Sequence, residues 1–284
     1  MKYEKGSIRS IGDCTVLNNG VRMPRLGYGV WQVENPKELD AGVKAAIRHG
    51  YISIDTAFIY GNEAGVGKAI RESGTPRENL FITTKLWNDS QRKGYDACLK
   101  AFGKSRKALG IDVVDLYLIH WPQKGKMVEA WKALIQLQRD GHARAIGVCN
   151  CQPHHLEEII QATGVIPAVN QVELHPWLSQ KPLLAYCEKE GIQVEAYSPL
   201  MTGHLGEVAE LSPIAARYGK TPAQIVLRWD LQNGLVVIPK SVHEARIVEN
   251  CSIFDFELAE ADMAALDALN RNRRFLPDPD TIDF

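Results

Sequence analysis

The sequence contains no apolar run of about 18 residues, the length that a membrane-spanning helix requires. Its first residues, MKYEKGSIRSIGD, also lack the apolar stretch of roughly 7 to 15 residues that marks a secretory signal peptide. We therefore expect a cytoplasmic protein that does not contact a membrane. Residues 1–12 are expected to form a flexible N-terminus.

An excess of charge of one sign is missing as well. The 284 residues include 33 lysines and arginines and 34 aspartates and glutamates, for a net charge of −1. Binding to nucleic acid or to an anionic membrane normally needs a broad positive potential, which this balance excludes. Any site for an anion therefore has to be local, and we predict a small-molecule ligand. We also expect the protein to be a monomer.

Cysteine pairs with metal-binding or redox spacing are also absent. The six cysteines are scattered, no two are separated by two residues, and only Cys149 and Cys151 lie close together. This spacing argues against a zinc ribbon or a dithiol redox motif, and reduced thiols are expected. His154-His155 and His175 lack an accompanying pattern of carboxylate or cysteine ligands, so we predict no metal site.

What the sequence does contain is a repeated unit, a short apolar or β-branched run followed by a segment of helical periodicity. The eight runs cover residues 26–31, 51–55, 80–85, 114–120, 143–149, 168–173, 193–198 and 235–239. Eight strand-helix units without a break in composition predict an α/β fold, a closed (β/α)8 TIM barrel. A doubly wound open sheet is the alternative, but GYGVWQ at residues 27–32 lacks the third glycine of a dinucleotide fingerprint.

Three further segments complete the predicted fold. Asn19-Gly20 is typical of a two-residue hairpin turn, and the hairpin is expected to plug the N-terminal end of the barrel. Gly65 and Gly67 lie inside the second helical segment, where we interpret them as helix-sheet packing rather than as a phosphate loop. The C-terminal tail, residues 271–284, is polar and is expected to lie over the surface.

Polar side chains gather at the predicted ends of the strands. In a barrel of this kind all C-terminal strand ends open on one face, where the active sites of such proteins lie. Each side chain alone could be structural, as a helix cap, a solvated lysine or a core histidine. Together they form a candidate site. They are Asp55, Lys85, His120, Asn150, Gln171, Tyr197, Ser198 and Lys240.

Tyr60, five positions after Asp55, completes a possible proton-donating group. A phenol has an ordinary pKa near 10, so a tyrosine acid needs help in losing its proton at neutral pH. A lysine ammonium about 4 Å away would attract the phenolate by ~4 kcal/mol at an effective dielectric of about 20. Lys85 is the candidate for this role, with buried Asp55 keeping it charged. His120 would hydrogen-bond the substrate oxygen.

The segments DTAFIYGNE, FITTKLWN, DLYLIHWP, NQVELHP, AYSPL and IPKSVHEARIVEN occur in this order. With them the sequence resembles the aldo-keto reductase superfamily along nearly all of residues 13–280, which implies one barrel domain over residues 1–284. The segments FITTKLWND, GVCN, YGKTPAQIVLRW and PDPD are most similar to the 2,5-diketo-D-gluconate reductase branch, with prostaglandin F synthases as related enzymes.

The resemblance implies Tyr60 as proton donor, Lys85 and Asp55 as the pair that tunes it, and His120 as the orienting partner. It also implies a nicotinamide cofactor that binds without a Rossmann domain. Cys149 stands where many members of the family have serine, which implies a weaker hydrogen bond to the carboxamide. The implied cofactor residues are Asn150 and Gln171 at the carboxamide, Tyr197 under the ring, and Ser198, Leu200, Lys240, Ser241, Val242, Arg246, Glu249 and Asn250.

The phosphate end has a physical argument of its own. Phosphates commonly bind these barrels at the loops after the seventh and eighth strands, next to a helix N-terminus. Ser198 and Leu200 would border the pyrophosphate, while Lys240 and Arg246 flank the start of the last barrel helix. Two cations at this position favour a 2′-phosphate, and hence NADPH.

The expected function is NADPH-dependent reduction of aldehydes and ketones, such as methylglyoxal or 2,5-diketo-D-gluconate, with Tyr60 as the acid. Trp31, Trp87 and Trp121 follow strands one, three and four and would form an apolar wall for a small carbonyl substrate. The short connection 123–126 suggests an open site. The alternatives are a non-catalytic barrel that senses redox state through bound nucleotide, a prostaglandin F synthase-type reductase, and a metal-dependent barrel hydrolase.

Overall fold

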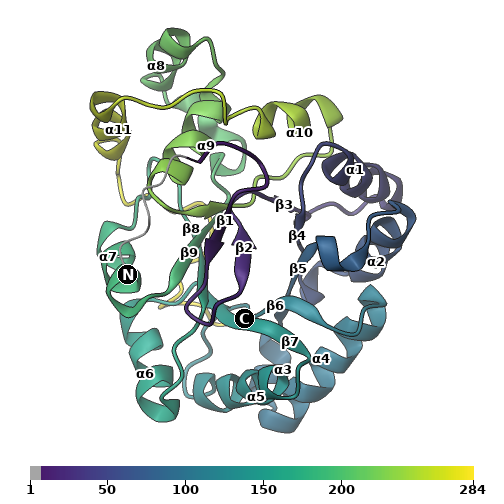
Figure 1. The fold of residues 1–284 in the computed structure, drawn as a ribbon. Coiled ribbons are helices and arrows are strands. Elements are labelled where there is room, and N and C mark those ends of the chain that lie inside the picture. Colours follow the sequence, from purple (N-terminus) through teal and green to yellow (C-terminus); the bar gives the residue numbers. More distant parts are fainter. Residues whose placement is uncertain (1–7) are drawn as a thin grey trace.

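The computed structural model describes residues 8–284 (Figure 1); the first seven residues of the predicted flexible N-terminus lie outside them. In this part of the chain eight parallel strands follow one another around a barrel in the order of the sequence. The predicted (β/α)8 fold is thereby confirmed. The strands are β3 (Gly27–Gly29), β4 (Ser53–Asp55), β5 (Phe81–Leu86), β6 (Val114–Ile119), β7 (Ala143–Cys149), β8 (Val169–Glu173), β9 (Gln193–Tyr197) and β10 (Val236–Val237).

The barrel closes where β10 meets the segment just before β3. Leu26 and Val237 form a parallel bridge, and the Val237 N–H donates to the carbonyl oxygen of Arg25 at 3.0 Å. At the other end of β3 the Gly29 N–H donates to the Pro239 oxygen at 3.1 Å. These bonds leave neither strand with an open edge, as the prediction of a closed barrel requires.

Helices surround the strands on the outside of the barrel (Figure 1). The predicted helical segment between β5 and β6 forms an amphipathic helix, in which Cys98, Phe102 and Leu109 are buried while the intervening lysines are exposed. No helix within residues 8–284 is long and apolar enough to span a membrane. The α-helices are α1 (Pro36–Arg48), α2 (Glu63–Glu72), α3 (Asn88–Arg92), α4 (Tyr95–Leu109), α5 (Met127–Arg139), α6 (Pro153–Thr163), α7 (Lys181–Glu190), α8 (Leu211–Tyr218), α9 (Pro222–Gln232), α10 (Glu244–Cys251) and α11 (Glu260–Asp267).

The predicted N-terminal hairpin is present as β1 (Cys14–Val16) and antiparallel β2 (Arg22–Pro24). Its loop differs from the prediction, since the Leu17 N–H donates to the Val21 oxygen and encloses three residues rather than two. Gly20, with a φ of 84°, takes the left-handed position that such three-residue loops place last.

The hairpin covers the N-terminal end of the barrel, as predicted for a plug. Leu17 and Met23 are buried in a cluster that includes Phe81 at the start of β5 and residues of four other strands. The Thr15 hydroxyl donates to the side-chain oxygen of Gln193, the first residue of β9, at 3.0 Å. The plug therefore keeps water from the bottom of the barrel interior.

The interpretation of Gly65 and Gly67 as helix-sheet packing is wrong. A Cβ on Gly67 would lie 2.0 Å from the backbone oxygen of Leu109 at the end of α4, and one on Gly65 would lie 2.6 Å from the Leu39 side chain of α1. Both glycines therefore let neighbouring helices approach α2. Sequence spacing does not distinguish the two packing partners, because helix and sheet alike require a small residue at a close contact.

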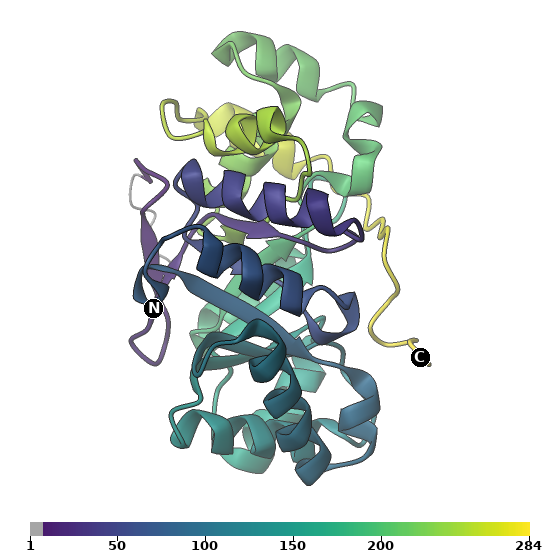
Figure 2. The ribbon, with the colours of Figure 1, turned by 90° about the vertical axis from the view of Figure 1, so that its right-hand side faces the viewer.

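The C-terminal tail, residues 271–284, does lie over the surface, but it is held at specific points. The N–H groups of Arg271 and Arg273 both donate to the Trp177 carbonyl oxygen. Those of Phe275 and Leu276 donate to the two carboxylate oxygens of Glu173, at the C-terminal end of β8. In Figure 2 the tail runs down the side of the barrel opposite the hairpin. It therefore crosses the mouth where the strands end.

We expect Gly67→Ala to destabilise the fold by about 1–3 kcal/mol, because the new methyl group would overlap the Leu109 carbonyl and force α2 from α4. Gly103→Ala in α4 is the matched control, since its Cβ would meet no atom within 4 Å. That change should stabilise the protein by about 0.5–1 kcal/mol through helix propensity. Chemical denaturation of both variants measures the difference, and equal stabilities would contradict the packing argument.

Candidate active site

A cavity of about 860 Å³ opens at the C-terminal ends of the strands. Nearly all of the predicted site residues line it: Trp31, Asp55, Tyr60, Trp87, His120, Trp121, Asn150, Gln171, Tyr197, Ser198, Leu200, Lys240, Ser241, Arg246, Glu249 and Asn250. Two do not reach its surface. Lys85 lies beneath the floor, against Asp55, and Val242 packs against the hydrophobic core.

Lys85 and Asp55 form an ion pair that is buried under the cavity. The Lys85 Nζ lies 2.5 Å from Asp55 Oδ1 and donates a second hydrogen bond to the backbone oxygen of Thr56 at 2.9 Å. The Lys85 side chain is 0% exposed. Burial is the largest single influence and lowers its pKa, but Asp55, followed by Tyr60 and Cys149, raises it by more in total, so the pKa is raised overall and the lysine stays charged.

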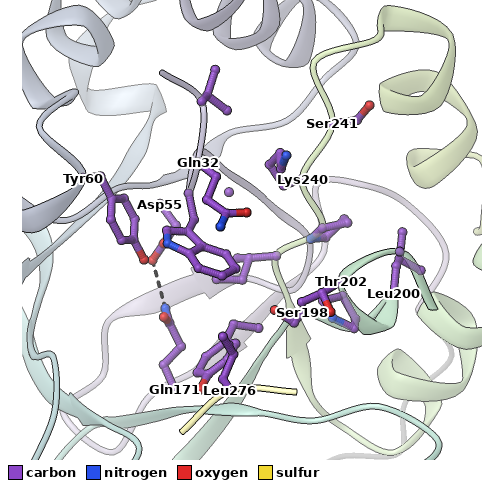
Figure 3. A pocket seen from close by; sticks show the side chains of 18 of the residues that line it. Gln32, Asp55, Tyr60, Gln171, Ser198, Leu200, Thr202, Lys240, Ser241 and Leu276 are labelled. Atoms are coloured by element: carbon purple, nitrogen blue, oxygen red, sulfur yellow. Dashed lines mark hydrogen bonds between the residues drawn. The ribbon is translucent and has the colours of Figure 1, made fainter. Parts of the chain in front are cut away.

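Tyr60 extends from the short 3-10 turn η1 (Phe58–Tyr60) over this pair. The Lys85 Nζ lies 5.2 Å from the centre of its ring, and Figure 3 shows the tyrosine beside Asp55. Burial raises the pKa of the Tyr60 phenol above its ordinary value, while Lys85 lowers it and Asp55 raises it. The ammonium therefore acts in the predicted direction but does not prevail, because burial has the larger effect on the pKa and Asp55 adds to it. Tyr60 holds its proton throughout the neutral pH range.

His120, at the end of β6, packs edge to face against Tyr60 with ring centres 5.6 Å apart. Burial, and next the charge of Lys85, lower the pKa of His120 well below its ordinary value. The imidazole is therefore neutral. Its Nδ1 is buried and has no hydrogen-bond partner within residues 8–284. A neutral histidine supplies a hydrogen-bond donor rather than an acid, which fits the orienting role.

Gln171 and Asn150 extend the site along the cavity. The amide nitrogen of Gln171 donates to Asp55 Oδ2 at 2.9 Å, drawn as the dashed line in Figure 3, and to Glu195 Oε2 at 2.7 Å. Asn150 donates to the His120 backbone oxygen at 3.0 Å and accepts the Tyr197 hydroxyl at 2.6 Å. These bonds fix two amides and one aromatic ring at the same wall.

The far end of the cavity carries two cations without counterions. Lys240 and Arg246 are exposed, and neither forms an ion pair with a carboxylate in the part of the chain that the structure describes. The loop after β9 lines the same end, and Ser198 and Thr202 in it have φ values of 50°. Two unpaired positive charges beside a cavity fit an anionic group such as a phosphate.

The apolar wall includes residues that the sequence analysis missed. Phe284 stacks on Trp87 with ring centres 6.0 Å apart and meets Trp121 edge to face at 5.6 Å. Its backbone oxygen accepts a hydrogen bond from the Asn88 amide at 3.0 Å. Leu276 and Pro277 of the tail line the cavity as well. The signal in the sequence that could have indicated this role is that Phe284 is an aromatic residue in an otherwise polar tail.

Glu195 is the second group that was missed. It is fully buried at the middle of β9, and its pairing partner in β8 is Gln171. An acidic residue between Val194 and Ala196 of a predicted strand was the signal in the sequence, comparable to that of Asp55. The prediction considered only strand ends, and Glu195 lies two residues before the end of β9.

The cysteine and histidine predictions concern the surroundings of this site. Cys149 is buried with its Sγ 3.9 Å from the Gln171 side-chain oxygen, and burial raises the pKa of its thiol well above the ordinary value. His154, His155 and Asp280 form the one group of three possible metal ligands within residues 8–284. None of the three lines the cavity.

Comparison with known proteins agrees with this geometry. Residues 25–271 match the model of the Aldo/keto reductase family. The chain is 54% identical to a glyoxal reductase of Bacillus subtilis, covering 97% of this chain and 99% of the relative, and 48% identical to a methylglyoxal reductase of Escherichia coli, covering 93% and 96%. A solved structure of a Gox0644 variant in complex with NADPH matches with a TM-score of 0.91 at 44% identity, over 96% of this chain and 99% of that one. The protein therefore belongs to the aldo/keto reductase family.

Proposed function

We propose that the protein reduces small aldehydes and ketones to alcohols with NADPH, and that dicarbonyls such as glyoxal and methylglyoxal are its substrates. The observation that carries the proposal is the neutral Tyr60 phenol, which stands over the buried Lys85–Asp55 pair at the floor of the cavity. The relatives named as glyoxal and methylglyoxal reductases support this substrate class. A keto sugar acid such as 2,5-diketo-D-gluconate also carries two ketone groups, so it belongs in the test.

The residues of the cavity suit NADPH. Gln171 and Asn150 offer amide groups for a carboxamide, and the ring of Tyr197 lies beside them for stacking. Lys240 and Arg246 at the other end suit the phosphates. When bound, NADPH supplies the hydride that adds to the carbonyl carbon. The known complex of the Gox0644 variant with NADPH supports the choice of cofactor.

The chain's own contribution is to hold the carbonyl and to deliver a proton to its oxygen. Tyr60 gives up its phenolic proton as negative charge develops on that oxygen, which is then more basic than a phenolate. Lys85 lies 5.2 Å from the ring and stabilises the phenolate until solvent returns a proton. Neutral His120 donates its N–H to the same oxygen and orients the substrate.

The four groups also favour an enzyme over a non-catalytic nucleotide sensor. A sensor would need the amides and cations of the cavity but not a buried lysine, whose desolvation opposes folding. Lys85 and Asp55 lie under Tyr60, whose ring packs against His120, and His120 in turn packs against Trp87. An ion pair that is costly to bury, placed directly under the proton donor, therefore favours a catalytic role for the site.

The substrate class is tested by following NADPH oxidation by absorbance with glyoxal, methylglyoxal, 2,5-diketo-D-gluconate and a simple aldehyde. We expect turnover with the dicarbonyls in the presence of NADPH. No turnover with any carbonyl in this panel would contradict the proposal. Addition of a chelator separates it from a metal-dependent hydrolase, since a reductase of this type should keep its full activity.

Tyr60→Phe should lower kcat for the best substrate by about 100-fold or more, because it removes the proton donor and little else. The Kd for NADPH, measured by fluorescence titration, should stay within about twofold of that of the parent. Tyr95→Phe is the matched control, since Tyr95 does not line the cavity. A Tyr60→Phe enzyme with parental kcat would rule out this acid.

Arg246→Ala should weaken NADPH binding by roughly ten- to a hundredfold, the loss expected for a charge-assisted contact with the 2′-phosphate. NADH lacks that phosphate, so its Kd should hardly change. Arg139→Ala on α5 provides a control for the loss of one exposed positive charge. Equal weakening of both cofactors would place Arg246 away from the 2′-phosphate.

A further inference from the structure

Glu195 is a buried acid that the proton-delivery argument leaves unused. Its Oε2 accepts a hydrogen bond from the Gln171 amide nitrogen at 2.7 Å, while its Oε1 has no partner within the described part of the chain. The same nitrogen donates to Asp55 Oδ2 at 2.9 Å. One amide group thus bridges two carboxyl groups beneath the cavity.

This bridge determines which way the Gln171 amide faces. An ionised carboxylate such as Asp55 only accepts hydrogen bonds, so the amide must turn its nitrogen toward it. With both N–H hydrogens used by Asp55 and Glu195, the plane of the amide is fixed as well. The carbonyl oxygen is left at the other side, where its neighbour is the Cys149 thiol at 3.9 Å. Because Gln171 lines the cavity, we take this oxygen as the acceptor for a group that binds there.

The charge of this cluster is the second observation. The titratable groups that face Glu195 are Asp55 from β4, Lys85 from β5 and Cys149 from β7, while its β10 neighbour is Val236. Lys85 is the one cation among these groups and is already paired with Asp55. Burial, and then repulsion from Asp55, raise the pKa of Glu195 to about 8. The acid is therefore neutral at pH 7 and ionises on raising the pH.

We infer that Glu195 is a positioning residue: through the Gln171 amide that it shares with Asp55, it holds the amide oxygen toward the nicotinamide carboxamide and places a second carboxyl group beneath the cofactor. The inference rests on the proposed function, since it takes Gln171 as the seat of the carboxamide. The oxidised cofactor carries one more positive charge on its ring than NADPH. An ionised Glu195 favours that charge, so raising the pH should favour NADP⁺ over NADPH.

The test is the ratio of the Kd for NADP⁺ to the Kd for NADPH, measured by fluorescence titration between pH 7 and pH 9.5. Both cofactors carry the same 2′-phosphate, whose titration cancels in the ratio. In the parent protein the ratio should fall by about fivefold or more as Glu195 ionises. In Glu195→Gln, which keeps an acceptor but cannot ionise, the ratio should not change with pH. A flat ratio in the parent would overturn the inference.

Glu195→Leu removes the acceptor and separates positioning from charge. It should weaken both cofactors by about three- to tenfold at every pH, because the Gln171 amide loses one of its two restraints. Asp230→Asn is the control for neutralising a buried acid, since Asp230 lies in α9 and does not line the cavity. In Asp230→Asn, the ratio of the Kd for NADP⁺ to the Kd for NADPH should change with pH as it does in the parent.

The outcomes distinguish the two proposals. A parent protein that binds neither cofactor contradicts the proposed function itself. A parent that binds NADPH and reduces carbonyls, but has the same pH dependence of binding as Glu195→Gln, contradicts only the role of Glu195. Circular dichroism of each variant checks folding, and an unfolded Glu195→Leu still leaves the comparison of the parent with Glu195→Gln decisive.

Discussion

The ion pair between Lys85 and Asp55 is the constraint on which the rest of the site depends. Removing a charged lysine from water costs several kcal/mol, which only a close partner and further hydrogen bonds offset. Asp55 at 2.5 Å, with the Thr56 oxygen at 2.9 Å, meets this requirement. Because Asp55 then has one oxygen left, the Gln171 amide nitrogen binds it, and this contact ties the proton-donating end to the cofactor end.

The barrel makes this chain of contacts possible by its register. Gln171 and Glu195 are paired neighbours in β8 and β9, so their side chains point into the same layer. Asp55 and Lys85 reach that layer from β4 and β5 on the other side of the interior. Groups that are far apart in the sequence are therefore held on strands rather than on loops. Such support keeps the geometry of the site within narrow limits.

Much of the fold and the site follows from the sequence, because the alternation of strand and helix patterns and the polar residues at strand ends are local signals. Asp55 and His120 were predicted from their position alone, and the cavity that they line includes nearly all of the predicted partners. The packing partners of Gly67 and the three-residue hairpin loop were not, because they depend on distances between elements. The net pKa direction of Tyr60 also requires the depth of burial, which no motif states. The place of Phe284 in the cavity wall was not predicted for a similar reason, since the tail has no helical or strand periodicity from which its position could be inferred.

The way in which the tail is anchored bears on how the substrate specificity of such a barrel can change. Glu173 accepts the N–H groups of two consecutive residues, Phe275 and Leu276, and so recognises main chain rather than side chains. Any residue other than proline at those two positions keeps an N–H for such a bond. The Phe275 ring adds contacts of its own, stacking on His204 with ring centres 4.7 Å apart, whereas the hydrogen bond at Leu276 does not depend on the side chain of the tail. Substitutions in residues 274–284 could reshape the entrance for new molecules while the machinery below stays untouched.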